Sequence, residues 1–273
     1  MRQIYPEPAV LTDRELAARY GDPAQAPEGG HWLRANMVMS LDGAATLAGR
    51  SGGLSGEADQ QVFALLRALA DVVMVGAGTA RVEGYGPVRP RTEGVRWAWL
   101  RAGRTHSPPI AVVTRRLDLD LESRLLAASP AHARTIVITT EAAPPGRRAA
   151  VAAMAELIVA GRQSVDVRAA VGALAERGYR HILTEGGPYL LSQIIGAGLL
   201  DELCLTVSPL LAGPGLSGIA INTLPLPVPL APDKKVINDA VVVAVHEQLL
   251  SVATEIEEVA LVLLMFSVVG EIV

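Results

Sequence analysis

The sequence predicts an α/β protein with a largely parallel central sheet that helices flank on both faces. Short apolar runs alternate with stretches of helical periodicity along most of the chain. Within most of these runs the apolar residues are consecutive, which is typical of strands that are covered on both faces. Half of the 273 residues are hydrophobic, which is ample for one large core. We therefore expect a main domain over residues 31–247, preceded by a helix and loop extension over 1–30 and followed by an apolar tail over 248–273.

The first third of the chain contains clear signals for individual elements. Thr12 and Glu15 have the spacing of a capping box and predict a short helix. A loop rich in proline and glycine follows over 22–30, and residues 32–40 then alternate in hydropathy as a strand does. We expect Ser55 to cap the next helix. The apolar stripe of that helix consists of Val62, Leu65, Leu66 and Leu69.

The rest of the chain up to residue 213 continues the alternation of strands and helices. Apolar runs predict strands over 71–75, 110–114, 135–139, 157–160 and 181–184. Helical stretches lie over 147–156, 165–177 and 188–199, and residues 84–107 are expected to be irregular. Beyond residue 213 the pattern is less regular, with a proline-rich segment over 224–232, a strand-like run over 241–246 and the apolar residues 249–273.

Composition and charge argue against several classes of protein. The 24 basic and 28 acidic residues give a net charge of −4, without the basic excess of a nucleic-acid-binding protein. Cys204 is the single cysteine and the five histidines lack ligand spacing, so we expect no disulfide and no metal site. The longest apolar run, 259–269, is shorter than the roughly 20 residues that span a bilayer. With no signal-peptide pattern near residue 1, we expect no membrane partner and a cytoplasmic location.

The first candidate ligand-binding segment is the loop Gly76-Ala77-Gly78-Thr79. It follows a buried strand, and glycines there allow backbone N–H groups to approach a phosphate closely. The loop lacks the third glycine of the Rossmann fingerprint, because Arg81 occupies that position. A cofactor loop and a plain strand-to-helix turn are both compatible with this pattern.

The second candidate is Glu185-Gly186-Gly187-Pro188, which follows another apolar strand. Pro188 suits the first position of a helix, and the N–H groups of that helix end suit a pyrophosphate. The Glu185 carboxylate comes at the carboxyl end of a strand, where α/β folds place ligand contacts. Two glycine loops after two strands favour a dinucleotide over a mere helix start, so we expect Gly186 and Gly187 to serve a ligand rather than stability.

Arginines provide candidate phosphate contacts at two further places. Thr114 and Arg115, with Arg116, end a third strand and have the chemistry to hold the ribose 2′-phosphate that distinguishes NADPH from NADH. Arg67 lies beside the apolar stripe of its helix. It is either a snorkelling, solvated arginine or a phosphate clamp that works together with Arg89 and Arg91.

Asp42 lies in the turn Ser40-Leu41-Asp42-Gly43 after the first long strand. It is a candidate proton donor or polar anchor for a ring, and the alternative is a residue that simply forms the turn. The motifs of metalloproteases, Walker-type nucleotidases and serine hydrolases are not found in the sequence.

Four segments, taken together, resemble the reductase domain of riboflavin biosynthesis proteins, the RibD C-terminal family. They are N-M-V-M-S-L-D-G over 36–43, L-L-R-A-L-A-D-V-V-M-V-G-A-G-T over 65–79, T-E-G-G-P-Y-L-L over 184–191 and G-L-L-D-E-L-C-L-T-V-S-P-L-L-A-G over 198–213. They follow one another in the order of the family, and the similarity extends over about residues 10–213. The resemblance implies a dihydrofolate-reductase-like fold, NADPH as cofactor and a homodimer. It also implies reduction of the ribosyl group of 5-amino-6-(5-phosphoribosylamino)uracil to a ribityl group.

The resemblance, together with the loops described above, implies roles for individual residues. The expected cofactor contacts are Gly76, Gly78, Thr79, Glu83, Thr114, Arg115, Gly186, Gly187, Pro188, Tyr189 and Leu190. The expected substrate contacts are Ser51, Arg67, Arg89 and Glu185, with the two arginines on the 5′-phosphate. Asp42 and Glu185 are the expected catalytic residues.

Three positions depart from the pattern of the family. Ala44 replaces a basic residue after S-L-D-G, Gly53 replaces a tryptophan and Glu83 replaces an aspartate. These departures concern the substrate more than the fold, and they keep two alternatives open: a dihydrofolate or pterin reductase on the same scaffold, and a non-catalytic nucleotide-binding protein. Arg67 and Arg89 favour a phosphorylated substrate, because an unphosphorylated pterin would not need them.

Overall fold

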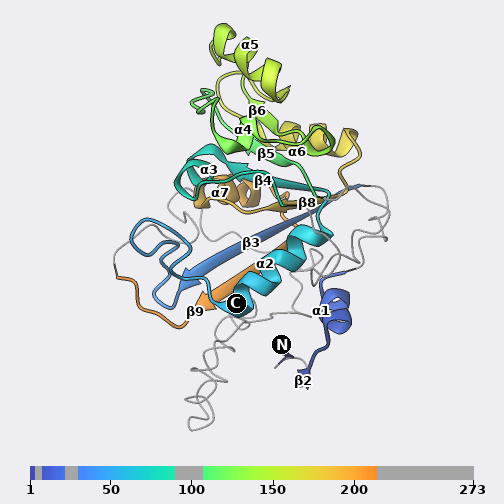
Figure 1. The fold of residues 1–273 in the computed structure, drawn as a ribbon, viewed down its shortest axis with the longest axis vertical. Coiled ribbons are helices and arrows are strands. Elements are labelled where there is room, and N and C mark those ends of the chain that lie inside the picture. Colours follow the sequence, from blue (N-terminus) through green and yellow to red (C-terminus); the bar gives the residue numbers. More distant parts are fainter. Residues whose placement is uncertain (4–7, 22–29, 90–106, 214–273) are drawn as a thin grey trace.

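The computed structural model describes residues 1–3, 8–21, 30–89 and 107–213; the expected strand over 241–246 and the tail over 248–273 lie outside the described residues. Its centre is a seven-stranded parallel sheet with the order β7-β6-β5-β4-β8-β3-β9 (Figure 1). The strands are β3 (Trp32–Ser40), β4 (Val72–Gly76), β5 (Ile110–Val113), β6 (Ile136–Thr139), β7 (Glu156–Val159), β8 (His181–Thr184) and β9 (Glu202–Ser208). The predicted α/β class and the parallel sheet are confirmed.

Helices cover both faces of this sheet. They are α1 (Asp13–Arg19), α2 (Glu57–Leu69), α3 (Ala77–Val82), α4 (Arg124–Ala127), α5 (Pro145–Met154), α6 (Val167–Glu176) and α7 (Pro188–Gly196). Val73 and Val75 of β4 belong to the core cluster that includes α1 and α2, whereas Val72 and Met74 belong to the cluster that includes α6 and α7. Successive residues of β4 therefore face opposite cores, which explains why the strand is apolar throughout.

Local signals in the sequence were accurate at some helix ends and wrong at others. The capping box of α1 is confirmed, because the Thr12 side chain accepts from the Glu15 N–H and the Glu15 carboxylate accepts from the Thr12 N–H. The expectation that Ser55 caps α2 is wrong. Gly56 is the N-cap residue, and the Ser55 hydroxyl instead donates a 2.6 Å hydrogen bond to Asp59.

Two parts of the fold were not predicted. The two-residue strands β1 (Arg2–Gln3) and β2 (Ala9–Val10) form a small antiparallel pair. Strand β9 pairs with β3 over seven residues, although no element was expected there. Its buried residues include the polar Glu202 and Thr206, which interrupt the apolar pattern by which a strand is recognised.

The strand order changes direction between β4 and β8. Strands β4 to β7 follow one another outward in one direction, whereas β8 lies between β4 and β3 (Figure 1). In open α/β sheets, ligands bind outside the carboxyl ends of the strands at such a switch point. The loops that begin at Gly76 and Glu185 both lie at this point.

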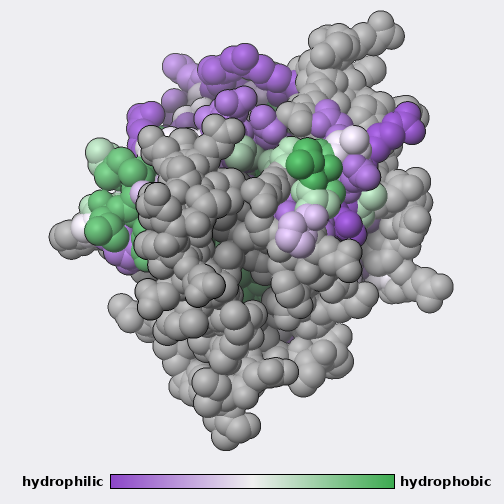
Figure 2. Space-filling view, turned by 90° about the horizontal axis from the view of Figure 1, so that it is seen from below, coloured by the Kyte–Doolittle hydropathy of each residue, from purple (hydrophilic) through white to green (hydrophobic). Residues whose placement is uncertain are grey.

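The visible surface is mixed in character. On the face shown in Figure 2, hydrophilic residues predominate among those coloured, and hydrophobic residues form separate groups. The most exposed large hydrophobic side chains among the described residues are those of Val10, Tyr189 and Leu211. None of the described helices has the length and apolar character needed to cross a bilayer.

Candidate active site

The two glycine loops meet at the carboxyl ends of β4 and β8. The Gly76 N–H donates a 2.7 Å hydrogen bond to the Gly186 carbonyl, and the Glu185 N–H donates one of 3.0 Å to the Met74 carbonyl. The peptide bond between Gly186 and Gly187 is cis, and Gly186 has a φ of 75°, in the region that favours glycine. The loops that the sequence shows as separate motifs therefore form one structural unit.

Gly187 has a packing role inside this unit. A Cβ atom at this position would lie 2.4 Å from Thr79 Oγ1, so a side chain there forces Thr79 to move. We therefore expect Gly187 to contribute to stability as well as to the binding of a ligand. Gly78 differs, because no atom lies within 4 Å of its Cβ position and a ligand can approach its backbone.

A cavity of about 560 Å³, called here the loop cavity, opens beside these loops. Its lining includes most of the expected cofactor contacts, namely Gly76, Gly78, Thr79, Glu83, Gly187, Pro188, Tyr189 and Leu190. The expected substrate contacts Ser51 and Glu185 line it as well. Because α3 and α7 begin at this cavity, their first-turn N–H groups, which have no partner within their own helices, contribute positive dipole ends to its wall.

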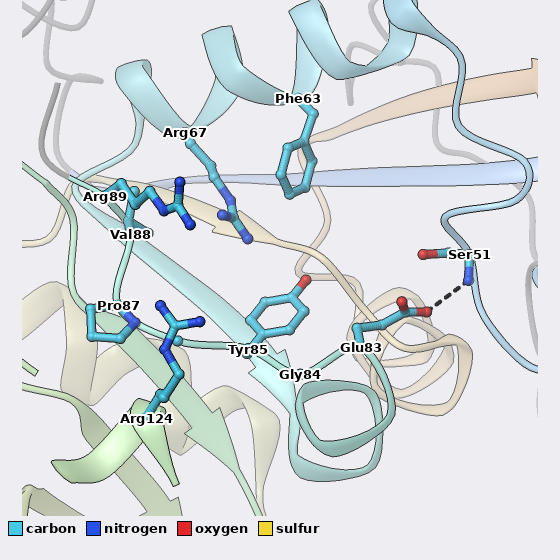
Figure 3. Close-up of a pocket in the computed structure, with 11 residues that line it drawn as sticks. Ser51, Phe63, Arg67, Glu83, Gly84, Tyr85, Pro87, Val88, Arg89 and Arg124 are labelled. Carbon is cyan, nitrogen blue, oxygen red and sulfur yellow. Dashed lines mark hydrogen bonds between the residues drawn. The ribbon is translucent and has the colours of Figure 1, made fainter. Parts of the chain in front are cut away.

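A second cavity of about 640 Å³, called here the arginine cavity (Figure 3), shares part of its lining with the first. Arg67, Arg89 and Arg124 line it, and their guanidinium groups point toward the space between them (Figure 3). The residues shared by both linings are Ser51, Phe63, Glu83 and Tyr85. Arg67 and Arg89 were expected substrate contacts, whereas Arg124 was not recognised from the sequence.

Arg67, which lines the arginine cavity, and Glu185, which lines the loop cavity, form a bidentate ion pair. Arg67 Nε lies 2.6 Å from Glu185 Oε1, and Nη2 lies 2.7 Å from Oε2. The Tyr85 hydroxyl donates a further 2.6 Å hydrogen bond to Oε2, and the guanidinium lies 4.1 Å from the ring centroid of Phe63. The Arg67 and Glu185 side chains are 18% and 3% exposed. The Glu185 carboxylate is therefore held by groups of the protein itself.

The same cluster sets the protonation of its members. Burial would lower the pKa of Arg67, but the charge of Glu185 and its hydrogen bonds outweigh burial and raise that pKa above its ordinary value. Burial and then the charge of Glu185 raise the pKa of Tyr85 well above its ordinary value. Arg67 thus stays cationic and Tyr85 stays a neutral donor near neutral pH.

Glu83 joins the two halves of the site. Its carboxylate accepts a 2.7 Å hydrogen bond from the Ser51 N–H (dashed line in Figure 3). Glu83 is the C-cap residue of α3, and Ser51 lies in the loop between β3 and α2. This bond ties the helix beside the loop cavity to the segment that carries an expected substrate contact.

Asp42 lines neither cavity. Its carboxylate accepts hydrogen bonds from the Ser40 hydroxyl, from the Ala212 N–H at 3.0 Å and from the Gly213 N–H at 2.7 Å. The Ser40 hydroxyl, followed by these two N–H groups, lowers the pKa of Asp42 to about 2. An ionised carboxylate that links the turn after β3 to the segment after β9, and that lines neither cavity, favours a residue that forms the turn over a proton donor or a polar anchor for a ring.

The anchoring contact gives a pH-dependent prediction. Because the pKa of Asp42 is lower in the folded chain than its ordinary 3.8, its stabilising effect is present above about pH 4 and is lost as the pH falls toward 2. Asp42→Ala is expected to melt below wild type at neutral pH, and the difference in Tm is expected to shrink over that acidic window. Thermal melts across this pH range test the prediction, which a constant difference in Tm contradicts.

Thr114 and Arg115 lie directly after β5, the strand beside β4. Thr114 is buried and its N–H donates a 2.9 Å hydrogen bond to the Ile138 carbonyl, whereas the Arg115 side chain is exposed. Neither residue lines the two cavities. The pair therefore lies at the carboxyl ends of the strands, as the glycine loops do, but outside the walls of the loop cavity.

Several residues of the two cavities were not predicted from the sequence. Asp59 and Phe63 line the loop cavity and lie eight and four residues, respectively, before Arg67 on α2, so the three share one helix face. That four-residue spacing is a signal that was available in the sequence. Arg124 follows an irregular stretch without periodicity, and it lies against Gly86, whose Cβ position is 3.7 Å from Arg124 Cζ.

A comparison with protein families decides the affiliation of the chain. The sequence model of the RibD C-terminal domain matches residues 31–237. The chain belongs to this family. The family resemblance seen in the sequence is thereby confirmed.

Individual relatives within the family agree with this assignment. The 2,5-diamino-6-ribosylamino-4(3H)-pyrimidinone 5′-phosphate reductase of Archaeoglobus fulgidus is 32% identical over 184 residues, which cover 65% of this chain and 80% of that protein. The protein of the same name from Methanothermobacter thermautotrophicus is 30% identical over 178 residues, covering 65% and 77%. The crystal structure of a pyrimidine reductase-like protein from Corynebacterium diphtheriae is 30% identical, with a TM-score of 0.64, and the match covers 75% of this chain and 84% of that one. The dihydrofolate-reductase-like fold of the RibD C-terminal family is therefore confirmed for this chain.

Proposed function

We propose that this chain is an NADPH-dependent pyrimidine reductase of riboflavin biosynthesis. Its substrate is a phosphorylated ribosylaminopyrimidine, either 5-amino-6-(5-phosphoribosylamino)uracil or the 2-amino counterpart named for the archaeal relatives, and its product carries a ribityl group. The observation that carries the proposal is the pair of adjoining cavities, one beside two helix N-termini and the other lined by three arginines. The first suits a pyrophosphate and the second suits a sugar phosphate.

The loop cavity fits the cofactor. The open space over Gly78 and the first turn of α7, with the N–H groups of Tyr189 and Leu190, suit a pyrophosphate. When bound, the nicotinamide supplies a hydride. The chain itself binds and orients the two partners, and Glu83 holds the Ser51 loop at the boundary between the cavities.

The arginine cavity fits the 5′-phosphate. Among the described residues, no acidic side chain forms an ion pair with Arg89 or Arg124, and both guanidinium groups point into the arginine cavity. Arg67 gives two of its donors to Glu185 and still has Nη1 for a ligand. This arrangement favours a phosphorylated substrate over an unphosphorylated pterin.

Turnover assays test the proposed function. We expect NADPH to be oxidised in the presence of a phosphoribosylaminopyrimidine, with a higher KM for the same compound without its 5′-phosphate because the arginines lose their partner. Oxidation with dihydrofolate or a dihydropterin instead would support the pterin alternative. NADPH binding without oxidation by any of these compounds would support the non-catalytic alternative.

The preference for NADPH over NADH is expected to depend on Arg115. Arg115→Ala should weaken NADPH binding by very roughly ten- to a hundredfold, because a lost charge-assisted contact to the 2′-phosphate costs about 1.5–3 kcal/mol. Binding of NADH, which lacks that phosphate, should be unchanged and is the matched control. Titration of both nucleotides measures the effect, and equal losses for the two would refute the 2′-phosphate contact.

We also propose a homodimer, in keeping with the family resemblance. In the described part of the chain β9 is an edge strand, and the exposed Leu210 and Leu211 that follow it offer apolar surface to a second copy. Light scattering after gel filtration is expected to give twice the 28.6 kDa of one chain. A mass of one chain at micromolar concentration would contradict the dimer.

A further inference from the structure

One face of α2 leads from the arginine cavity into the loop cavity. Asp59, Phe63 and Arg67 follow one another at intervals of four residues on this face. Arg67 lines the arginine cavity, Phe63 lines both cavities and Asp59 lines the loop cavity. With a rise of about 1.5 Å per residue, Asp59 and Arg67 are separated by roughly 12 Å along the helix, which suits a ligand with a phosphate at one end and a heterocycle at the other.

Asp59 is a buried acid with capacity for further hydrogen bonds. The residue is 6% exposed. Its Oδ1 accepts a 2.6 Å hydrogen bond from Thr206 Oγ1, and its Oδ2 accepts one of 2.6 Å from Ser55 Oγ. A carboxylate has about four lone-pair positions, so each oxygen retains one for a ligand.

Asn36 adds a second acceptor to the same cavity. It lies on β3, is 8% exposed and lines the loop cavity. No described residue donates a hydrogen bond to its buried Oδ1. A buried acceptor without a donor is unfavourable. Because Asn36 lines the loop cavity, a turn of its side chain would bring this oxygen to a ligand N–H. Asp59 and Asn36 together make this wall complementary to a ligand edge rich in N–H donors.

We propose that Asp59, assisted by Asn36, recognises the pyrimidine ring and selects a 2-amino-4(3H)-pyrimidinone over a uracil. This inference rests on the proposed function. With the 5′-phosphate in the arginine cavity, the ring edge opposite the sugar substituent, centred on N3, faces the Asp59 end of the helix. Asp59 and Asn36 act here as specificity-determining residues.

The two rings differ at that edge in a way a carboxylate distinguishes. In the 2-amino ring, N3–H and the 2-amino group are adjacent donors that match the two oxygens of Asp59. In the uracil ring, a carbonyl oxygen replaces the amino group and would face a carboxylate oxygen, so two acceptors oppose each other. A site built to accept a hydrogen bond rejects an analogue that lacks the donor, because its buried acceptor is left unpaired.

The test compares kcat/KM for the two phosphoribosylaminopyrimidines. Wild type is expected to favour the 2-amino ring by at least about tenfold, the lower end of the effect of one charge-assisted hydrogen bond. Asp59→Asn, which replaces one acceptor oxygen by a donor, should reduce this ratio by at least about tenfold. Equal kcat/KM values in wild type, or an unchanged ratio in Asp59→Asn, would overturn the proposal.

A matched variant and a binding measurement complete the experiment. Glu57 is an exposed residue of the same helix and lines neither cavity. Glu57→Gln removes its charge, and the ratio of kcat/KM values for the two rings should equal that of wild type. NADPH titration shows whether Asp59→Asn is folded. If that variant does not fold, the ratio of the kcat/KM values of wild type for the two rings tests the proposal by itself. If wild type reduces neither ring, the proposed function fails. If it reduces both equally well, only the role of Asp59 fails.

Discussion

Arg67→Ala is expected to lower the free energy of unfolding by about 3–5 kcal/mol, the usual effect of removing one partner of a buried ion pair. The variant leaves the Glu185 carboxylate, whose side chain is 3% exposed, with the Tyr85 hydroxyl but without its cation. Chemical denaturation of wild type and variant measures this difference. The exposed pair of Arg177 and Glu156 is the matched control, because Arg177→Ala should change stability by less than about 1 kcal/mol.

The same variant is expected to raise the KM for the phosphoribosyl substrate more than it lowers kcat. A phosphate contact made in both the ground state and the transition state contributes uniform binding, whose loss appears in KM. Arg67→Lys should recover only part of the loss, since a point charge does not reproduce the planar fork.

A double variant separates the two roles of Arg67. Arg67→Ala with Glu185→Gln removes the buried unpaired charge, so stability should largely return while the KM stays high. A single variant as stable as wild type would contradict the ion pair. An unchanged KM in the single variant would refute the phosphate contact.

Gly187→Ala is expected to weaken NADPH binding at least about tenfold and to destabilise the chain by about 1–3 kcal/mol, the range for overpacking. The added Cβ would lie 2.4 Å from Thr79 Oγ1, so either the Thr79 side chain or the first turn of α7 must shift. These are the groups that line the loop cavity. Thermal melts and NADPH titration measure the two effects independently.

Two further variants test the cause of this effect. Adding Thr79→Ala removes the clashing oxygen, so the double variant should regain stability while NADPH binding stays weak. Gly172→Ala lies in α6, where no atom is within 4 Å of the Cβ position, and it should stabilise the chain by roughly 0.5–1 kcal/mol. A Gly187→Ala variant with the same Tm as wild type would contradict the close packing of Gly187 against Thr79. A variant that keeps its affinity for NADPH would refute the assignment of this loop to the cofactor.

Much of the fold could be predicted because its signals are local. The apolar run expected over 71–75 is strand β4, displaced by one residue, and Pro188 occupies the first position of α7 as its ring geometry favours. The short elements α5 and β7 begin within two residues of the expected bounds. Strand β9 could not be recognised in this way, because its place beside β3 depends on pairing with a distant strand and its buried Glu202 and Thr206 hide the apolar pattern.

The sequence by itself determined the parallel α/β architecture, the two glycine loops and the presence of arginines suited to phosphate, because each depends on residues close together in the chain. Only the tertiary structure decided how these parts act on one another. Arg67 reaches Glu185 across 118 positions, and Asp59 receives a hydrogen bond from Thr206 across 147. These contacts arise because β8 lies between β4 and β3 and β9 lies beyond β3, and strand order is a property of the packed sheet that no local spacing in the sequence reveals.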